Sequence, residues 1–169
     1  NVPVVSCNRI NNPLVAEELL VEGVADMIGM ARGLIADPDF VNKAKAGKFD
    51  EIRQCVACNQ RCFDRVFMLS AVGCAVNPRA GREAETEFGP ASTPKKILVA
   101  GGGPAGCEFA ITAAQRGHKV IVCERDTHIG GQVGWFAGAT HKQDFSYLVD
   151  YFQTMLSRNG VELRMGTTV

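Results

Sequence analysis

The sequence has no excess of charge of either sign, no long apolar run and no signal peptide. Lys plus Arg and Asp plus Glu each total 18 of 169 residues, so the formal net charge is zero. A neutral balance lacks the basic footprint by which proteins bind DNA or RNA. No apolar run approaches the roughly 20 residues that span a bilayer. We therefore expect neither a nucleic acid nor a membrane as a partner.

The sequence also lacks an initiator methionine, since it opens with Asn1-Val2-Pro3. Hydrophobic residues make up 46% and charged residues 21%, which is ordinary globular composition. The length suits one domain or parts of two. We expect an internal fragment of a longer protein. Crowded cysteines without secretion signals suit a reducing compartment, so we expect that protein to be cytoplasmic.

Residues 1–49 repeat one pattern twice. Val2–Val5 and Ala25–Met30 are predicted strands, and helical patterns follow Asn12-Pro13 and Asp37-Pro38. This order implies parallel strands with helical crossovers. Two such units cannot close a barrel, which needs about 250 residues, so we interpret them as the C-terminal part of a TIM (β/α)8 barrel, its last two βα units. The apolar residues expected to face inward are Leu14, Val15, Leu19 and Leu20 in the first helix and Phe40, Val41 and Ala44 in the second.

Residues 50–78 contain four crowded cysteines with the spacing Cys55-x2-Cys58-x3-Cys62-x11-Cys74. Thiolates are soft ligands that suit iron–sulfur clusters and zinc. Structural zinc sites usually use two separated pairs, and the second pair is missing here. The spacing favours an iron–sulfur cluster, with a zinc site or reduced thiols without metal as the alternatives. Isolated Cys7, Cys107 and Cys123 are interpreted as small buried hydrophobic residues.

Residues 79–94 are polar and contain two prolines, which is typical of a linker. A new α/β domain then follows over residues 95–169. Strands are predicted at Ile97–Ala100, Val120–Cys123 and Val161–Met165. A first helix runs through Arg116, and a second carries an amphipathic stripe of Phe145, Leu148, Val149, Phe152 and Leu156. The pattern βαβαβ is the first half of a Rossmann-like domain.

A glycine-rich turn follows the first strand of this domain. Gly101, Gly103 and Gly106 lie between an apolar strand and a helix, the context in which this motif binds a dinucleotide pyrophosphate. Glu124 ends the second strand, where an acid can accept hydrogen bonds from a ribose. Gly130-Gly131-Gln132 offers a second close-approach loop. The pattern does not separate FAD from NAD, and a turn without ligand is the alternative.

Two arginines follow the strands of the barrel-like region. Arg9 and Arg32 lie where the last loops of a barrel commonly hold phosphate, although solvated surface arginines are an equal alternative. The three histidines match no ligand spacing, and His118 is expected at the surface. For Trp135 and Phe136, ordinary packing is favoured over a place beside a cofactor ring. No residue is assigned a catalytic role.

Five motifs together resemble a known family. They are Asn8-Arg9-Ile10-Asn11, Met30-Ala31-Arg32, the Cys55–Cys62 segment CVACNQRC, Cys74-Ala75-Val76-Asn77-Pro78-Arg79 and the Gly101 turn. Their order is similar to that in 2,4-dienoyl-CoA reductase, enoate reductase and trimethylamine dehydrogenase, which are iron–sulfur flavoproteins of the old yellow enzyme type. The resemblance spans essentially the whole chain.

The resemblance implies an FMN-bearing barrel, a 4Fe–4S cluster and a module for FAD and NAD(P)H. In the reductases, electrons pass from NAD(P)H to FAD, across the cluster to FMN, and then to an activated C=C bond of an unsaturated acyl-CoA or carboxylate. By this resemblance, three groups of residues would hold cofactors: Arg9, Ala31 and Arg32 the FMN phosphate side; Cys55, Cys58, Cys62 and Cys74 the cluster; Gly101, Gly103, Pro104, Ala105, Gly106, Glu124, Arg125, Gly131 and Gln132 the FAD.

Two alternatives stay open. The trimethylamine dehydrogenase type has two residues between the second and third cysteines, so the three found here favour the reductases. The second enzyme hypothesis is an amine or betaine-type dehydrogenase or demethylase on the same scaffold. The hypothesis from another class of protein is a non-catalytic nucleotide-binding module that a zinc ion stabilises. The fragment alone is expected to be inactive and to retain no FMN.

Overall fold

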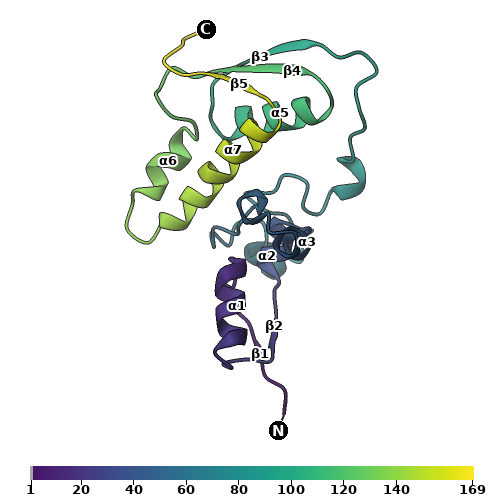
Figure 1. The fold of residues 1–169 in the computed structure, drawn as a ribbon, viewed down its shortest axis with the longest axis vertical. Helices are drawn as coiled ribbons and strands as arrows, with labels where there is room; N and C mark the ends of the chain where they lie inside the picture. The colour runs from purple at the N-terminus through teal and green to yellow at the C-terminus, as the bar shows by residue number, and fades with distance from the viewer. Residues whose placement is uncertain (1) are drawn as a thin grey trace. The chain divides into compact units, whose positions relative to one another are not determined.

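The computed structural model describes residues 2–169, which divide into two compact units, residues 2–86 and 87–169. The division falls inside the polar stretch 79–94. Each unit contains parallel strands joined by helices (Figure 1). The α/β class predicted from the alternating patterns is therefore confirmed. No helix among residues 2–169 is long and apolar enough to cross a membrane.

The first unit contains two short parallel strands. Strand β1 (Val5–Ser6) pairs with β2 (Met27–Ile28), and helix α1 (Pro13–Val21) connects them. The predicted cap of α1 is confirmed, because the Asn12 side chain accepts a hydrogen bond from the Leu14 N–H at 2.9 Å. Pro13 occupies the first helical position, where its missing N–H costs nothing. The remaining elements are α2 (Arg32–Ala36), α3 (Phe40–Lys45), η1 (Phe49–Glu51), α4 (Phe63–Phe67) and η2 (Glu83–Glu85).

Several predicted details of this unit are wrong. Helix α1 has no buried residue, because no described element packs over the side of Leu14, Val15 and Leu20. The helix expected from Asp37-Pro38 begins only at Phe40, since residues 37–39 form a turn. Phe40 is buried as expected, but Val41 is exposed because it lies on the opposite side of a six-residue helix. Helix α2 was not predicted, since five residues are too few to display helical periodicity.

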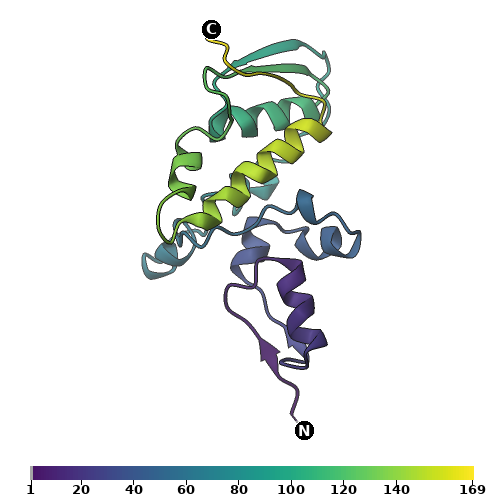
Figure 2. The same ribbon diagram turned by 60° about the vertical axis from the view of Figure 1, so that its left-hand side comes forward.

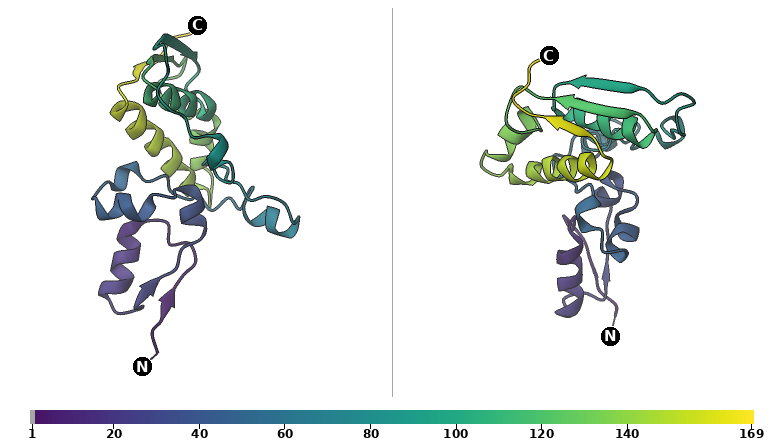
Figure 3. Two further views of the ribbon diagram at one scale, coloured as in Figure 1. Left: turned by 90° about the vertical axis from the view of Figure 1, so that its right-hand side faces the viewer. Right: turned by 45° about the horizontal axis from the view of Figure 1, so that its top comes forward.

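The second unit is a three-stranded parallel sheet in the order β3-β4-β5. Strand β3 (Lys96–Ala100) pairs with β4 (Lys119–Cys123), and β4 pairs with β5 (Glu162–Arg164). Helix α5 (Pro104–Gln115) connects β3 to β4, and α6 (Gln132–Ala137), η3 (Gln143–Phe145) and α7 (Ser146–Arg158) connect β4 to β5. Helices α5 and α7 lie on the same face of the sheet (Figures 1 and 3).

The core of the second unit lies between this sheet and its two long helices. Helix α7 buries Leu148, Tyr151, Phe152 and Leu156, so the predicted stripe is largely confirmed, with Phe145 and Val149 only half-buried. Figure 2 shows α5 and α7 packed side by side beneath the strands. Cys107 and Cys123 are buried here as predicted, whereas Cys7 of the first unit is exposed. Phe109 of α5 is exposed, because it faces away from the sheet.

The register of the parallel strands determines which residues lie together at the carboxyl edge of each sheet. Ala100, Cys123 and Arg164 are aligned at the carboxyl edge of β3, β4 and β5. Ser6 and Ile28 are aligned in the same way at the carboxyl ends of β1 and β2. Ligands of parallel α/β folds bind at the carboxyl ends of strands. The loops that follow these ends therefore form the candidate sites in each unit.

Replacement of Leu156 by Ala tests the core of the second unit. The Leu156 side chain is fully buried, so the variant is expected to lose about 2–5 kcal/mol of unfolding free energy. Gln153→Ala on the exposed side of the same helix is the control, with a change within about 0.5 kcal/mol. Urea unfolding followed by circular dichroism measures both, and equal effects would contradict this description of the core.

Candidate functional site

The carboxyl ends of β1 and β2 border a cavity of about 470 Å³. Its lining brings together Arg9, Ala31 and Arg32, the three residues proposed for the phosphate side of a flavin. Cys55, the first cysteine of the crowded segment, lines the same cavity. Residues far apart in the sequence thus share one space, because the parallel register of β1 and β2 brings their following loops to one edge.

The loop after β1 has an unusual backbone. Asn8 and Arg9 both adopt the left-handed region, with φ of 83° and 56°. Such conformations cost about 1–2 kcal/mol for non-glycine residues and persist only where the surrounding structure holds them. Arg32 supplies one such contact, since its Nη2 donates to Asn8 Oδ1 at 3.4 Å. The strained loop directs two polar residues to the rim of the cavity.

The cysteine segment folds as a loop with alternating left-handed residues. Ala57, Asn59 and Arg61 have φ of 53°, 59° and 64°. The turn at Ala57 directs its N–H to Cys55 Sγ at 3.4 Å. The Gly73 N–H donates to the Arg61 carbonyl at 2.6 Å, which ties the stretch before Cys74 to this loop. All four cysteines are partly buried.

The thiols of this segment act on one another electrostatically. Burial raises the pKa of Cys55, while the Ala57 N–H and the Arg32 guanidinium lower it and Cys74 and Cys58 raise it. Burial likewise raises the pKa of Cys58, with the Gln60 N–H opposing this effect and Cys74 and Cys62 adding to it. These couplings link all four cysteines into one neighbourhood. A thiol with a raised pKa remains protonated at neutral pH until a metal displaces the proton.

The four cysteines supply the soft thiol donors that an iron–sulfur cluster would take. Among residues 2–169, no group of three His, Cys, Asp or Glu side chains is placed to hold a single metal ion. A 4Fe–4S cluster takes one thiolate at each of four separate irons, so its ligands lie farther apart than those of a single zinc. Four soft, mutually coupled thiols with backbone N–H groups directed at sulfur match that requirement.

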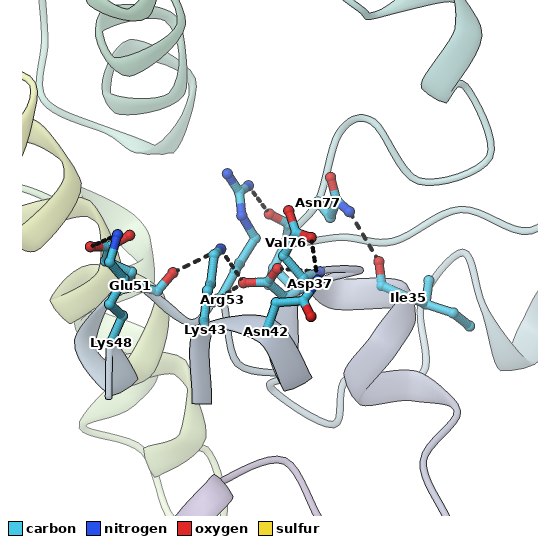
Figure 4. Close-up of polar contacts among 10 residues, drawn as sticks. Ile35, Asp37, Asn42, Lys43, Lys48, Glu51, Arg53, Val76 and Asn77 are labelled. Carbon is cyan, nitrogen blue, oxygen red and sulfur yellow. Dashed lines mark hydrogen bonds and ion pairs between the residues drawn. The ribbon is translucent and has the colours of Figure 1, made fainter. Parts of the chain in front are cut away.

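A buried polar network anchors the cysteine segment to the helices of the first unit (Figure 4). The Asp37 carboxylate accepts hydrogen bonds from Lys43 Nζ at 2.6 Å, the Arg53 N–H at 2.8 Å and the Asp39 N–H at 3.1 Å. The buried Arg53 guanidinium donates in turn to the Val76 carbonyl. Arg53, before the four cysteines, is therefore bonded to Asp37 through its backbone and to Val76, after the cysteines, through its side chain.

Two asparagines complete this attachment. The Asn77 side chain donates to the Ile35 carbonyl at 3.0 Å and accepts from the Arg79 N–H at 3.0 Å. The Asn11 side chain donates to the Cys55 carbonyl. Sequence reasoning missed Asp37 and Arg53, because a charged residue that will be buried carries no local pattern. The Val-Asn-Pro sequence after Cys74 was the one available signal for Asn77.

The carboxyl edge of the second unit borders another cavity, of about 360 Å³. Its lining includes five residues predicted to hold a dinucleotide, namely Gly101, Glu124, Arg125, Gly131 and Gln132. Gly103, Pro104, Ala105 and Gly106 form the start of α5 beside it and are not among the lining residues. The Arg125 side chain is largely exposed, with its Nε 3.8 Å from Asp126 Oδ1.

Glu124 is the buried carboxylate of this site. It accepts hydrogen bonds from the Gly102 N–H at 2.6 Å and the Asp126 N–H at 3.0 Å. The N–H groups of Asp126 and Gly102 lower the pKa of Glu124, so the side chain is ionised at neutral pH. The carboxylate therefore fixes the glycine turn from within. Its oxygens retain lone pairs for a further donor such as a ribose hydroxyl.

A different physical constraint requires glycine at each of three positions in the turn. Gly101 has φ of +101°, which side chains rarely adopt. A Cβ on Gly106 would lie 2.0 Å from the Gly101 carbonyl oxygen, so the close approach of helix and turn excludes one. A Cβ on Gly103 would meet no protein atom within 4 Å and would instead fill the space in front of the turn. In dinucleotide-binding turns, a glycine at such an open position lets a pyrophosphate approach the backbone.

The second glycine loop lies directly against the first. The Gly130 N–H donates to the Gly102 carbonyl at 2.8 Å, and a Cβ on Gly131 would lie 3.4 Å from Gly103 Cα. The packing predicted for Trp135 is wrong, because the residue is 75% exposed, whereas the half-exposed Phe136 packs its ring against that of Phe145, with 5.8 Å between the ring centroids. Trp135 lines the cavity instead and stacks edge-on with His128. His118 accepts a hydrogen bond from the Lys95 N–H at the surface.

Comparison with known proteins agrees with both halves of this description. Residues 1–51 match the NADH:flavin oxidoreductase / NADH oxidase family, and residues 96–164 match the FAD dependent oxidoreductase family. Each of the two matched segments is thus similar to flavin-dependent oxidoreductases. The resemblance inferred from the five motifs is thereby confirmed.

Three relatives illustrate the similarity. A metal reductase of Desulforamulus reducens is 49% identical over 167 residues, which cover 99% of this chain and 25% of that protein. An NADH oxidase of Thermoanaerobacter brockii is 45% identical over 99% of this chain and 26% of its own length. The structure of 2-naphthoyl-CoA reductase with 2-naphthoyl-CoA superposes with a TM-score of 0.97 at 37% identity, covering 100% of this chain and 26% of that one.

The chain thus spans about a quarter of the length of the relatives that it matches. Further relatives are named for two kinds of reaction. They include a cinnamate reductase of Clostridium sporogenes and an N,N-dimethylglycine/sarcosine dehydrogenase of Chromohalobacter salexigens, at 36% and 39% identity.

Substitution of Asp37 tests the anchoring network. Asp37→Asn removes the charge opposite Lys43 and leaves fewer acceptors for three donors, so we expect local stability to fall by about 2–4 kcal/mol. Hydrogen exchange at the Arg53 N–H measures this loss directly. Lys48→Met, which breaks the exposed Lys48–Glu51 pair, is the control and is expected to change protection by less than about 1 kcal/mol. If the Arg53 N–H of Asp37→Asn were as well protected from hydrogen exchange as in the parent protein, the stabilising role of this network would be refuted.

Two glycine substitutions separate ligand binding from folding in the second unit. Gly103→Ala is expected to fold with stability within about 0.5 kcal/mol of the parent but to lose bound FAD, because its methyl group fills the open position. Gly106→Ala is expected to lower stability by about 1–3 kcal/mol, because its methyl group collides with backbone. Flavin content after purification and thermal unfolding give the two readouts. Full FAD retention in Gly103→Ala would contradict the assignment.

Proposed function

We propose that this chain is part of a cytoplasmic NAD(P)H-dependent oxidoreductase. Electrons would pass from NAD(P)H through FAD, a 4Fe–4S cluster and FMN to the activated C=C bond of an enoate or 2,4-dienoyl-CoA type substrate. One observation carries the proposal. Two arginines suited to a phosphate and the first cysteine of a four-cysteine loop line the same cavity, as two redox groups in series would require.

Arg9, Ala31 and Arg32 are proposed to hold the phosphate side of FMN. Guanidinium groups match phosphate oxygens in geometry as well as charge. Arg32 is half-buried at the first position of α2, so its side chain is held at the cavity rim. Loops at the carboxyl ends of barrel strands bind phosphate in many enzymes, which supports this assignment.

Cys55, Cys58, Cys62 and Cys74 are proposed to bind the cluster. When bound, such a cluster supplies one-electron transfer between two flavins that each handle electron pairs. The protein's own contribution is to hold the four sulfurs at fixed positions. The left-handed turn at Ala57 directs its N–H at Cys55 Sγ, and the Asp37 network holds residues on both sides of the segment.

Gly101, Gly103, Pro104, Ala105 and Gly106 are proposed to receive the FAD pyrophosphate at the start of α5, where N–H groups and the helix dipole favour an anion. Glu124 would accept the ribose hydroxyls. Arg125, Gly131 and Gln132 are assigned to the same ligand because they line the cavity with Glu124. The match of residues 96–164 to FAD dependent oxidoreductases supports FAD over NAD at this turn.

The relatives differ in the substrate with which the flavins exchange electrons. The cinnamate reductase and 2-naphthoyl-CoA reductase similarities support a carboxylate or acyl-CoA with conjugated C=C bonds. The dimethylglycine/sarcosine dehydrogenase similarity supports the alternative, an amine oxidised on the same scaffold. Three residues between Cys58 and Cys62 favour the reductase.

Metal analysis of the full-length protein, purified without oxygen, tests the proposal. We expect about four irons and four sulfides per chain, together with FAD and FMN identified after release. Cys74→Ser is expected to lose most of the iron because a hydroxyl is a poor ligand for it. Cys7→Ser is the matched control and should retain iron, since Cys7 is exposed and outside the four.

One zinc and no iron per chain would refute electron transfer through this loop and favour the stapled binding module. Substrate tests separate the two enzyme readings. Oxidation of NAD(P)H driven by a cinnamate-type acid or an unsaturated acyl-CoA supports the reductase. Reduction of the bound flavins by a tertiary amine, with no such acid or thioester accepted, would replace it with the dehydrogenase.

A further inference from the structure

Arg32 contacts both the cavity and the cysteine loop of the first unit. Its Nη1 donates to Asn59 Oδ1 at 2.6 Å, and its Nη2 donates to Asn8 Oδ1 at 3.4 Å. Asn59 lies between Cys58 and Cys62, whereas Asn8 follows β1. One guanidinium therefore joins the end of a barrel strand to the loop proposed to hold the cluster.

The same guanidinium borders the cavity. Arg32, Asn8 and Cys55 all line it, whereas Asn59 of the described chain is not among its lining residues. A guanidinium has five N–H donors in a planar fork, so the bonds to two asparagines leave donors for an anion. Arg32 thus borders the cavity while it is held by Asn59, which is not one of the lining residues.

The charge of Arg32 reaches the cysteines. Arg32 and Cys55 line the same cavity, so the positive charge of the guanidinium acts on the Cys55 sulfur across that space. A positive charge at that range also favours addition of an electron to any redox group that the sulfur binds. A phosphate placed on Arg32 would offset this charge, because the phosphate carries a negative charge of similar size.

We propose that Arg32 is a positioning residue that couples the two prosthetic-group sites. Asn59 fixes the guanidinium for the FMN phosphate, and the bound phosphate in turn weakens the positive field at the cysteine loop. This inference rests on the proposed function. Since coupling between two sites is reciprocal, a change in the cysteine loop alters FMN affinity, and FMN alters the potential of the cluster.

The first test measures FMN binding to the full-length protein after removal of its flavin. Asn59→Gly deletes the acceptor while keeping the left-handed backbone that glycine adopts readily. We expect about tenfold weaker FMN binding for Asn59→Gly and about a hundredfold for Arg32→Met. The double variant should match Arg32→Met, because Asn59 acts through Arg32 and the effects do not add.

The matched control is Asn42→Ala, which removes an exposed amide bonded only weakly to Asp39, at 3.4 Å. It should leave FMN affinity within about twofold. Wild-type FMN affinity in Asn59→Gly, or additive effects in the double variant, would overturn the role assigned to Arg32.

The second test measures the midpoint potential of the cluster in flavin-free protein given FMN or riboflavin. FMN is expected to lower the potential, because its phosphate offsets the charge of Arg32. Riboflavin lacks the phosphate and should leave the potential nearly unchanged. The FMN effect should shrink in Asn59→Gly at saturating FMN. Equal shifts with FMN and riboflavin would overturn the coupling.

Failure of the two proposals can be told apart. A wild-type protein that contains no iron–sulfur cluster or binds no FMN refutes the proposed function, and the coupling with it. A wild-type protein that holds both groups, but whose FMN affinity is unchanged by Asn59→Gly, refutes the coupling alone.

Discussion

The first unit depends on one buried carboxylate. Asp37 ends α2, accepts from Lys43 in α3 and accepts from the backbone of Arg53 at the start of the cysteine segment. A buried charge is tolerated only when its partners satisfy it, so these three elements cannot separate without exposing or orphaning it. Arg53 extends the same constraint to Val76 beyond the last cysteine. The long cysteine loop, which has little secondary structure, therefore has both of its ends fixed.

Both candidate sites follow from one rule of parallel sheets. In each unit, helices carry the chain back across the sheet, so consecutive loops emerge at the same carboxyl edge. Asn8 and Arg32 meet in this way after β1 and β2, and Gly101 and Glu124 meet after β3 and β4. The residues between each pair serve mainly to form the crossover. This explains how short motifs that lie far apart in the sequence come together at the two cavities described above.

Local signals in the sequence predicted the regular elements well. Asn12-Pro13 marked the start of α1, and the stripe of Leu148, Phe152 and Leu156 marked the buried side of α7. The glycine turn also had the expected strand and helix on either side. The wrong predictions share one cause, because tertiary packing determined whether these side chains are buried or exposed. Val41 and Trp135 are apolar residues that the described fold leaves exposed, and Asp37 is a charged residue that it buries. The Arg32–Asn59 contact joins residues 27 positions apart, and no periodicity announces such a pair.

Cys55 lines the cavity that is proposed to receive the FMN phosphate. A ligand filling that space would also form a lid over this sulfur and over whatever the sulfur binds. Loss of the ligand would admit solvent, and with it dioxygen, to the most oxygen-sensitive group proposed for the protein. The order in which the prosthetic groups bind and dissociate would therefore decide how long the cluster is exposed to dioxygen. With both proposed groups in place, a bound flavin would shield the iron from oxidation, and aerobic damage would begin once the flavin had left.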